Sequence, residues 1–130
     1  MGVDVERLRS IPLFAELGEE ELGWLAERVS ERSVAEGVSV THEGMAGYAF
    51  FMIEGGEAKV VHGDQEVRRL SAGDTFGEAA IIGDGHRTAD VVAATELELL
   101  AMFGTHFREL QMDMPELAER IEATMKLRRD

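Results

Sequence analysis

The chain has 130 residues, of which 26 are acidic and 13 are basic, so its formal net charge is −13. This length predicts one domain over residues 1–130, and a 45% hydrophobic content is enough for a core without disulfides or metal. The negative charge disfavours DNA, RNA and anionic membranes as partners, and the absence of cysteine excludes thiolate metal sites and thiol nucleophiles.

The first 32 residues show helical spacing. Val5 and Leu8 lie on one side of a short amphipathic turn, which Pro12 interrupts. From Glu19 to Arg28, apolar residues recur at three- and four-residue steps, which predicts a helix of about three turns. Its first turn is acidic and therefore suits the positive end of the helix dipole.

Between residues 33 and 103 the apolar period changes to two, which is typical of β-strands. Gly55-Gly56 separates two apolar runs as a hairpin turn does, and a Gly-Asp pair recurs every ten positions. Short strands at this spacing favour a mainly β fold, an antiparallel β-roll or jelly roll. We expect strands at about 33–41, 48–54, 57–62, 65–70, 88–94 and 97–102.

After Gly104 the helical period resumes, and residues 104–130 are expected to form two helices. Pro115 suits the first position of the second helix. The predicted order is therefore an N-terminal helical segment at about 1–32, a β-roll at 33–103 and two C-terminal helices at 104–130. The helices flank the β-roll on both sides in sequence. The apolar positions of these last helices are Phe107, Leu110, Met114, Leu117, Ile121 and Met125.

The segment from Phe76 to Val91 interrupts the strand pattern and carries the chemistry. A one-turn helix is expected just after Gly77, and its first backbone N–H groups would bind an anion. Arg87 adds a fork of donors that matches two phosphate oxygens. Glu78 would accept hydrogen bonds from ligand hydroxyls. Together these features predict a site for a sugar phosphate or a nucleotide.

The sequences FGEAAI at 76–81 and RTADV at 87–91 resemble the phosphate-binding cassette of the cyclic nucleotide-binding domain family. The resemblance extends to IPLF at 11–14, FMIEG at 51–55 and the approach to the cassette at 70–75. It implies a β-roll that binds cyclic AMP or cyclic GMP as its ligand, with no further cofactor. The ligand-binding residues that it implies are Phe76, Gly77, Glu78, Ala79, Ala80, Arg87 and Thr88.

The resemblance also implies a role for each of these groups. Glu78 corresponds to the family residue that binds the ribose 2′-hydroxyl, and Arg87 to the one that pairs with the cyclic phosphate. Ala79 and Ala80 would supply main-chain donors. A hydroxyl at Thr88 resembles family members that accept cyclic GMP and does not exclude cyclic AMP.

Three features depart from the family pattern. His86 stands where a proline often precedes the arginine, and Met45 replaces an acidic residue after a loop glycine. The final helix, which covers the base in the family, has only about four turns here. We expect Ile121 and Met125 to face the base and Glu122 to offer a polar contact.

The predicted function is a cytoplasmic regulatory sensor that passes a conformational change through its C-terminal helices. No apolar run reaches the length of a membrane helix, and no basic region leads into an apolar one as in a secretory signal, so we expect a cytoplasmic protein. The effector stays open between a channel and a separate partner, as in a channel-type or stand-alone sensor. A homodimer through residues 115–127 also stays open.

Two other functions compete with that of a nucleotide sensor. One is a non-catalytic interaction module with a vestigial pocket, which the short last helix favours and Glu78 and Arg87 oppose. The other is a metal-dependent jelly-roll enzyme, but the four histidines lie at least twenty positions apart and no catalytic triad spacing occurs. We therefore expect a binding protein without a metal, and not an enzyme.

Overall fold

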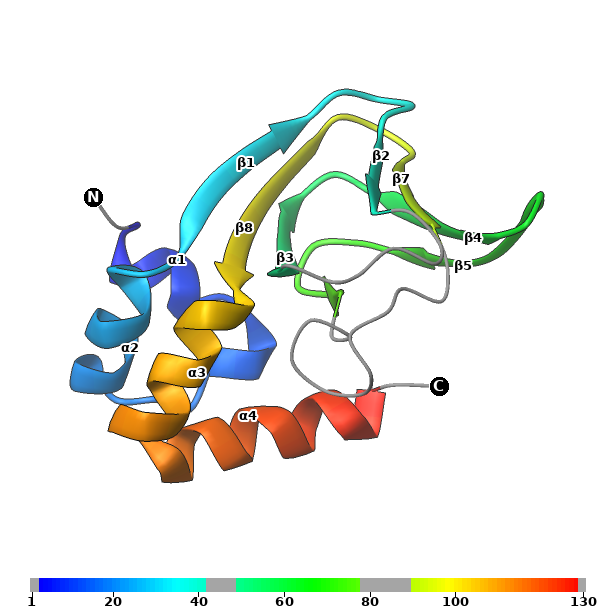
Figure 1. Ribbon diagram of the computed structural model, residues 1–130. Coiled ribbons are helices and arrows are strands. Elements are labelled where there is room, and N and C mark those ends of the chain that lie inside the picture. Colours follow the sequence, from blue (N-terminus) through cyan, green and yellow to red (C-terminus); the bar gives the residue numbers. More distant parts are fainter. Residues whose placement is uncertain (1–2, 42–48, 78–89, 129–130) are drawn as a thin grey trace.

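The described strands form two four-stranded antiparallel sheets, with helices gathered at one end (Figure 1). The computed structural model describes residues 3–41, 49–77 and 90–128. One sheet has the order β1-β8-β3-β6 and the other the order β2-β7-β4-β5. The strands are β1 (Ser30–Val34), β2 (Ser39–Thr41), β3 (Ala49–Gly55), β4 (Ala58–His62), β5 (Gln65–Leu70), β6 (Thr75–Phe76), β7 (Asp90–Ala93) and β8 (Leu97–Phe103).

The helical end is built from the N-terminal and the C-terminal parts of the chain. The N-terminal part contributes α1 (Val5–Arg9), the 3-10 helix η1 (Pro12–Phe14) and α2 (Glu19–Ala26). The C-terminal part contributes α3 (Gly104–Asp113), which continues directly from β8, and α4 (Pro115–Arg128). In Figure 1, α4 runs beneath the other helices and the strands. The predicted class, mainly β with flanking helices, is confirmed.

The β3 and β8 strands separate two hydrophobic cores, because alternate side chains point to opposite faces of a strand. Phe50 and Met102 face the helices, together with Phe14, Leu25 and Phe107. The intervening side chains of the same two strands, including Ile53 and Leu99, face the interior of the roll. The near-continuous apolar run of β3 is therefore the signature of a strand that is buried on both faces.

The strand expected over residues 33–41 is wrong in its extent. The structure has β1 at Ser30–Val34 and β2 at Ser39–Thr41, in different sheets. A turn separates them, where Gly37 has a φ of +87° and its N–H donates to the Ala93 carbonyl at 2.8 Å. The short strand β6 was not expected, because two residues are too few to show a period.

An arginine fixes the first helix to the end of the central strand. Arg7 donates from Nε and Nη2 to the two carboxylate oxygens of Glu54, at 2.9 and 2.6 Å. A second carboxylate, that of Glu31 on β1, lies 3.1 Å from Arg7 Nη1. The hydrogen bonds from Arg7 to Glu54 and Glu31 raise the pKa of the guanidinium above its ordinary value. The α1 helix is thus tied to both β3 and β1.

Candidate functional site

The chain that leads into the predicted cassette is held against the end of β3. Ile53 N–H donates to the Asp74 carbonyl at 2.9 Å, and Gly73 N–H donates to the Ile53 carbonyl at 2.8 Å. The Asp74 carboxylate closes the same turn by accepting from Ser71 N–H at 2.8 Å. Three hydrogen bonds therefore fix the position from which β6 begins.

Phe76, the first residue of the cassette, packs in the interior of the roll. It pairs with Phe51 of β3, and the two rings stack with their centroids 5.1 Å apart. Only 3% of Phe76 is exposed. The next residue, Gly77, has a φ of +84°, a conformation that favours glycine over residues with a Cβ. The buried strand β6 is thus followed directly by a glycine in the left-handed region.

The chain returns from the cassette in the other sheet. Asp90 and Val91 of β7 pair with Val61 and Val60 of β4. Val91 is buried in the interior of the roll. The described chain therefore stops at Gly77, after β6 beside β3 in one sheet, and resumes at Asp90 beside β4 in the other.

The structure places only part of the predicted site. Phe76 is the last residue of β6, and Gly77 follows it. The remaining predicted ligand groups lie outside the described residues, namely Glu78, Ala79, Ala80, Arg87 and Thr88. Two positions at which the sequence departs from the family pattern, Met45 and His86, also lie outside the described residues.

The predicted base-facing residues lie on α4. Ile121 is 2% exposed and belongs to the core among the helices, together with Leu117. Glu122 is half-buried, and the side chain of Met125 lies outside the described part of the chain. In this arrangement Ile121 packs against the helical core, so α4 would have to shift for Ile121 to reach a ligand in the roll.

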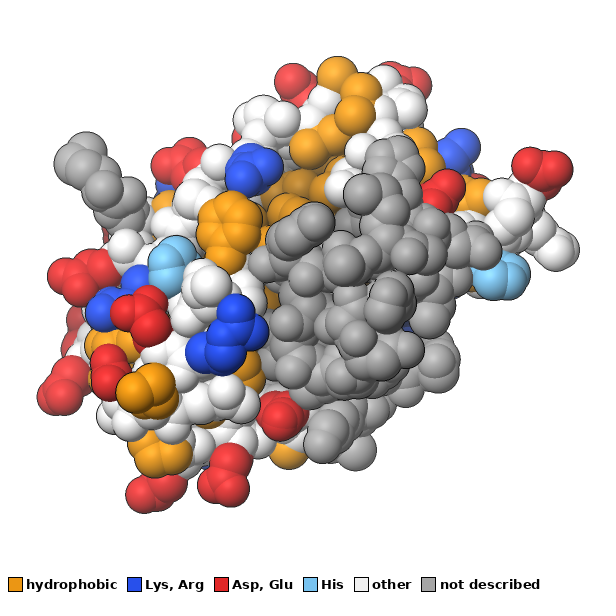
Figure 2. Space-filling view, viewed as in Figure 1, with side chains coloured by type: hydrophobic (Ala, Val, Ile, Leu, Met, Phe, Trp, Pro, Cys, Tyr) orange, Lys and Arg blue, Asp and Glu red, His pale blue; other side chains and the backbone are white. Residues whose placement is uncertain are grey.

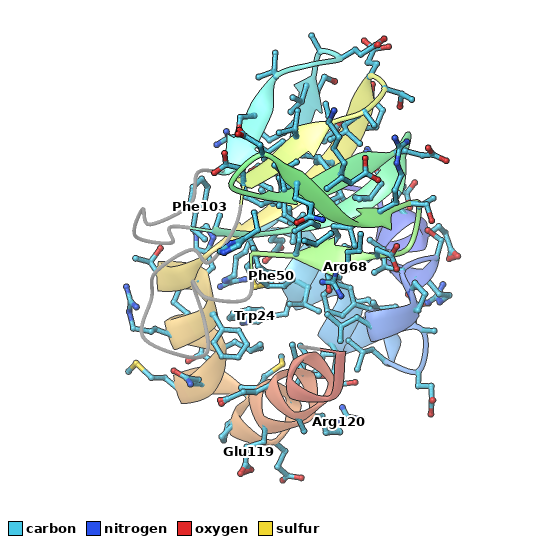
Figure 3. The ribbon with its side chains drawn as sticks, turned by 90° about the vertical axis from the view of Figure 1, so that its right-hand side faces the viewer. Trp24, Phe50, Arg68, Phe103, Glu119 and Arg120 are labelled. Atoms are coloured by element: carbon cyan, nitrogen blue, oxygen red, sulfur yellow. The ribbon has the colours of Figure 1, made fainter. Side chains whose placement is uncertain are left out.

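One polar residue of the inner strand face was missed by the sequence reasoning. In the β4–β5 pair, Ala58 lies opposite Leu70 and Val60 lies opposite Arg68. Ala58 and Leu70 are buried in the roll, so the alternation of the strands places Arg68 on the same face of β5, where its side chain is exposed. Figure 3 shows the Arg68 side chain below the strands, on the side of the helices. The signal was Leu70, since residue i−2 of a strand shares its face.

The described residues add two further observations. Among them, no group of three or more His, Asp or Glu side chains is arranged to hold a metal ion. Also within that part of the chain, no helix has the length and apolarity needed to cross a membrane.

The comparison with protein families identifies one domain. The model of the cyclic nucleotide-binding domain matches residues 31–113, which include the whole segment between β6 and β7. The chain is 37% identical over 120 residues to a cyclic nucleotide-gated potassium channel from Rhizobium etli, covering 92% of this chain and 34% of the channel. It is 36% identical over 124 residues to isozyme 1 of a cGMP-dependent protein kinase from Drosophila melanogaster, covering 89% of this chain and 16% of the kinase.

Solved structures agree on the fold. A crystal structure of a putative cyclic nucleotide-binding protein from Geobacter metallireducens superposes with a TM-score of 0.84. The match covers 92% of this chain and 89% of that protein, at 23% identity. The chain spans about a third of the channel relative and about a sixth of the kinase relative, so it corresponds to one module of those longer proteins.

Proposed function

Because the chain belongs to the cyclic nucleotide-binding domain family, we propose that it is a regulatory module that binds cyclic AMP or cyclic GMP through the segment between β6 and β7. The observation that carries this proposal is the cassette motif in its structural context. The motif starts at the buried Phe76, turns at the positive-φ Gly77 and ends in β7. Both relatives contain the domain as part of a longer regulated protein.

Different residues of the cassette would bind different parts of the ligand. Arg87 would pair with the cyclic phosphate, and the backbone N–H groups at Ala79 and Ala80 would donate to the same oxygens. Glu78 would accept a hydrogen bond from the ribose 2′-hydroxyl. These roles rest on the resemblance of 76–91 to the family cassette, and Phe76 would serve them by fixing where the cassette begins.

The two purines present different edges to the inner face of the roll. Guanine offers the O6 and N7 acceptors, whereas adenine replaces O6 by an amino donor. A guanidinium at Arg68 suits the two acceptors of guanine and would meet the amino group of adenine unfavourably. With the hydroxyl of Thr88, this cation favours cyclic GMP. The proposed preference is therefore cyclic GMP over cyclic AMP.

A shift in the population of two conformations would convert binding into a signal. A ligand that binds one conformation more tightly than another moves the equilibrium towards the first. The chain passes from β8 of the roll directly into α3, and Phe107 and Leu110 of α3 share a core with Leu117 and Ile121 of α4. We infer that the C-terminal helices carry the change.

Thermal unfolding with ligands tests the binding proposal. A ligand at a hundred times its dissociation constant adds about 2.7 kcal/mol of stability, which for this length raises the midpoint by about 10 °C. We expect this shift with cyclic AMP or cyclic GMP and none with 5′-AMP, and we expect Arg87→Ala to abolish it.

Arg69→Ala is the matched control, because it removes a different arginine from an exposed position on β5. This control should keep the full shift. If no nucleotide at millimolar concentration stabilises the wild type, the chain is an interaction module with a vestigial pocket and the proposal fails. If the ligand leaves amide exchange in residues 104–128 unchanged, the signalling role of the C-terminal helices is overturned, but the binding proposal is not.

A further inference from the structure

A groove lies between the N-terminal segment and α4, apart from the cassette. Its volume is about 430 Å³, which falls within the range of sites that bind small molecules or side chains. One wall is formed by η1 and the turn after it, and the other by the first half of α4. The lining residues are Pro12, Leu13, Glu16, Leu17, Leu117, Arg120, Ile121 and Ala123.

The groove has an apolar floor. Ile121 and Leu117 are almost fully buried, and the half-buried Leu13 and Leu17 pack against the same helical core. Six of the eight lining residues are apolar. An apolar groove beside a helix suits the aliphatic side chains that an amphipathic helix presents at i, i+3, i+4 and i+7.

The two segments that form the walls are rich in acidic residues, and the lining itself holds one glutamate, Glu16, and one arginine, Arg120. Residues 12–21 and 115–123 together contain seven glutamates and one arginine. That arginine, Arg120, donates to Glu21 at 3.1 Å, so its charge is matched within the walls. Glu16 lines the groove and is exposed. Figure 2 shows acidic side chains spread over the helical end of the molecule, and Figure 3 shows Glu119 and Arg120 on α4.

We propose that this groove is a docking site for a basic amphipathic helix of another protein. The apolar floor would receive its aliphatic side chains, and Glu16, with the glutamates that flank the lining on both segments, would attract its lysines and arginines. Charge complementarity selects this occupant, because a second copy of this chain would bring a net charge of −13 towards the same acidic segments. The groove lies apart from the cassette and shares only Ile121 with the predicted base-facing residues of α4, and its test does not depend on nucleotide binding.

The test uses methyl NMR of the whole chain and a synthetic peptide. The probe is an 18-residue helix with leucine on one face and lysine on the other. The control peptide has the same composition in scrambled order. We expect the amphipathic peptide to shift the methyl signals of Leu13, Leu17, Leu117 and Ile121, and to leave Leu70 and Leu97 of the roll unchanged. Binding should weaken with added salt.

Two pairs of variants locate the site. Ala123→Phe places a ring in the groove and should weaken binding about tenfold or more, whereas Gln111→Phe, at an exposed position of α3 outside the groove, should not. Glu16→Gln should weaken binding about two- to fivefold, whereas Glu36→Gln, an equal charge change in the β1–β2 turn, should have a smaller effect. The methyl spectrum of each variant reports whether it is folded.

Several results would overturn the proposal. The two peptides could bind equally well, or the methyl shifts could spread over the roll. Ala123→Phe could also leave the affinity for the amphipathic peptide unchanged. Concentration-dependent shifts of the groove methyls without peptide would assign the groove to a second copy of this chain instead.

Discussion

The carboxylate of Glu21 connects the start of α2 to the middle of α4. One oxygen accepts from Gly18 N–H at 3.1 Å and thereby satisfies a free donor at the N-terminus of α2. The other oxygen accepts from Arg120 Nη2, also at 3.1 Å, across 99 positions of sequence. One side chain therefore stabilises a helix end and links the N-terminal segment to the last helix.

The first prediction concerns this link. In a double-mutant cycle of Glu21→Gln and Arg120→Ala, we expect a coupling energy of about 0.5 kcal/mol, because the pair is partly exposed. Glutamine can still accept from Gly18 N–H, so the cycle isolates the ion pair. Urea unfolding of the four proteins measures it. The same cycle with Glu20→Gln, an exposed neighbour in the first turn of α2, should show no coupling, and equal couplings would contradict the assignment.

The second prediction concerns the anchor of α1. Arg7→Ala should lower the free energy of unfolding by about 1–2 kcal/mol, since it removes a bidentate charged hydrogen bond to Glu54. Arg7→Lys should recover only part of this loss, because a lysine cannot form the bidentate pair. Chemical unfolding provides the measurement. A lysine variant as stable as the wild type would show that the charge alone is sufficient.

The pH dependence of this contribution follows from the raised pKa of Arg7. A folded-state pKa above the unfolded one gives stability that is fully present below the unfolded pKa and is lost only as the pH rises through the folded one. The difference in stability between the wild type and Arg7→Ala should therefore stay constant between about pH 7 and pH 10. A difference that decays within this range would argue against a role for the Arg7 charge.

The third prediction concerns the hairpin glycine between β3 and β4. Gly56 has a φ of +90°, and a Cβ there would lie 2.2 Å from the Glu96 carbonyl oxygen. Because that oxygen belongs to the backbone, Gly56→Ala should destabilise the fold by at least about 2 kcal/mol. Gly63→Ala is the control, since Gly63 also has a positive φ but open space around it. Thermal unfolding should show the larger loss for Gly56→Ala.

The fourth prediction tests the proposed preference for guanine. Arg68→Ala should weaken binding of cyclic GMP about tenfold and slightly raise the affinity for cyclic AMP, because it also removes the unfavourable contact with the adenine amino group. Arg69→Ala is the control, because it lies on the opposite face of the same strand. Calorimetric titration with both nucleotides distinguishes the outcomes. An equal loss for the two ligands would show that Arg68 does not read the base.

The sequence alone was sufficient where the information is local. The cassette motif at 76–91 is recognised from neighbouring residues, since its chemistry needs a glycine, a carboxylate and an arginine at short spacing. Periods of two and 3.6 located the main strands and helices, because side-chain direction follows directly from backbone geometry. Proline at position 115 likewise marked the start of α4.

Features that depend on distant pairs were decided by the tertiary structure. Whether residues 33–41 form one strand or two depends on which strands lie alongside, and β1 and β2 pair with β8 and β7 in separate sheets. The face on which Arg68 lies depends on its register with β4, and the contact of Glu21 with Arg120 depends on how α2 and α4 pack. Such pairings arise from burial shared across the whole chain, which no local pattern of residues encodes.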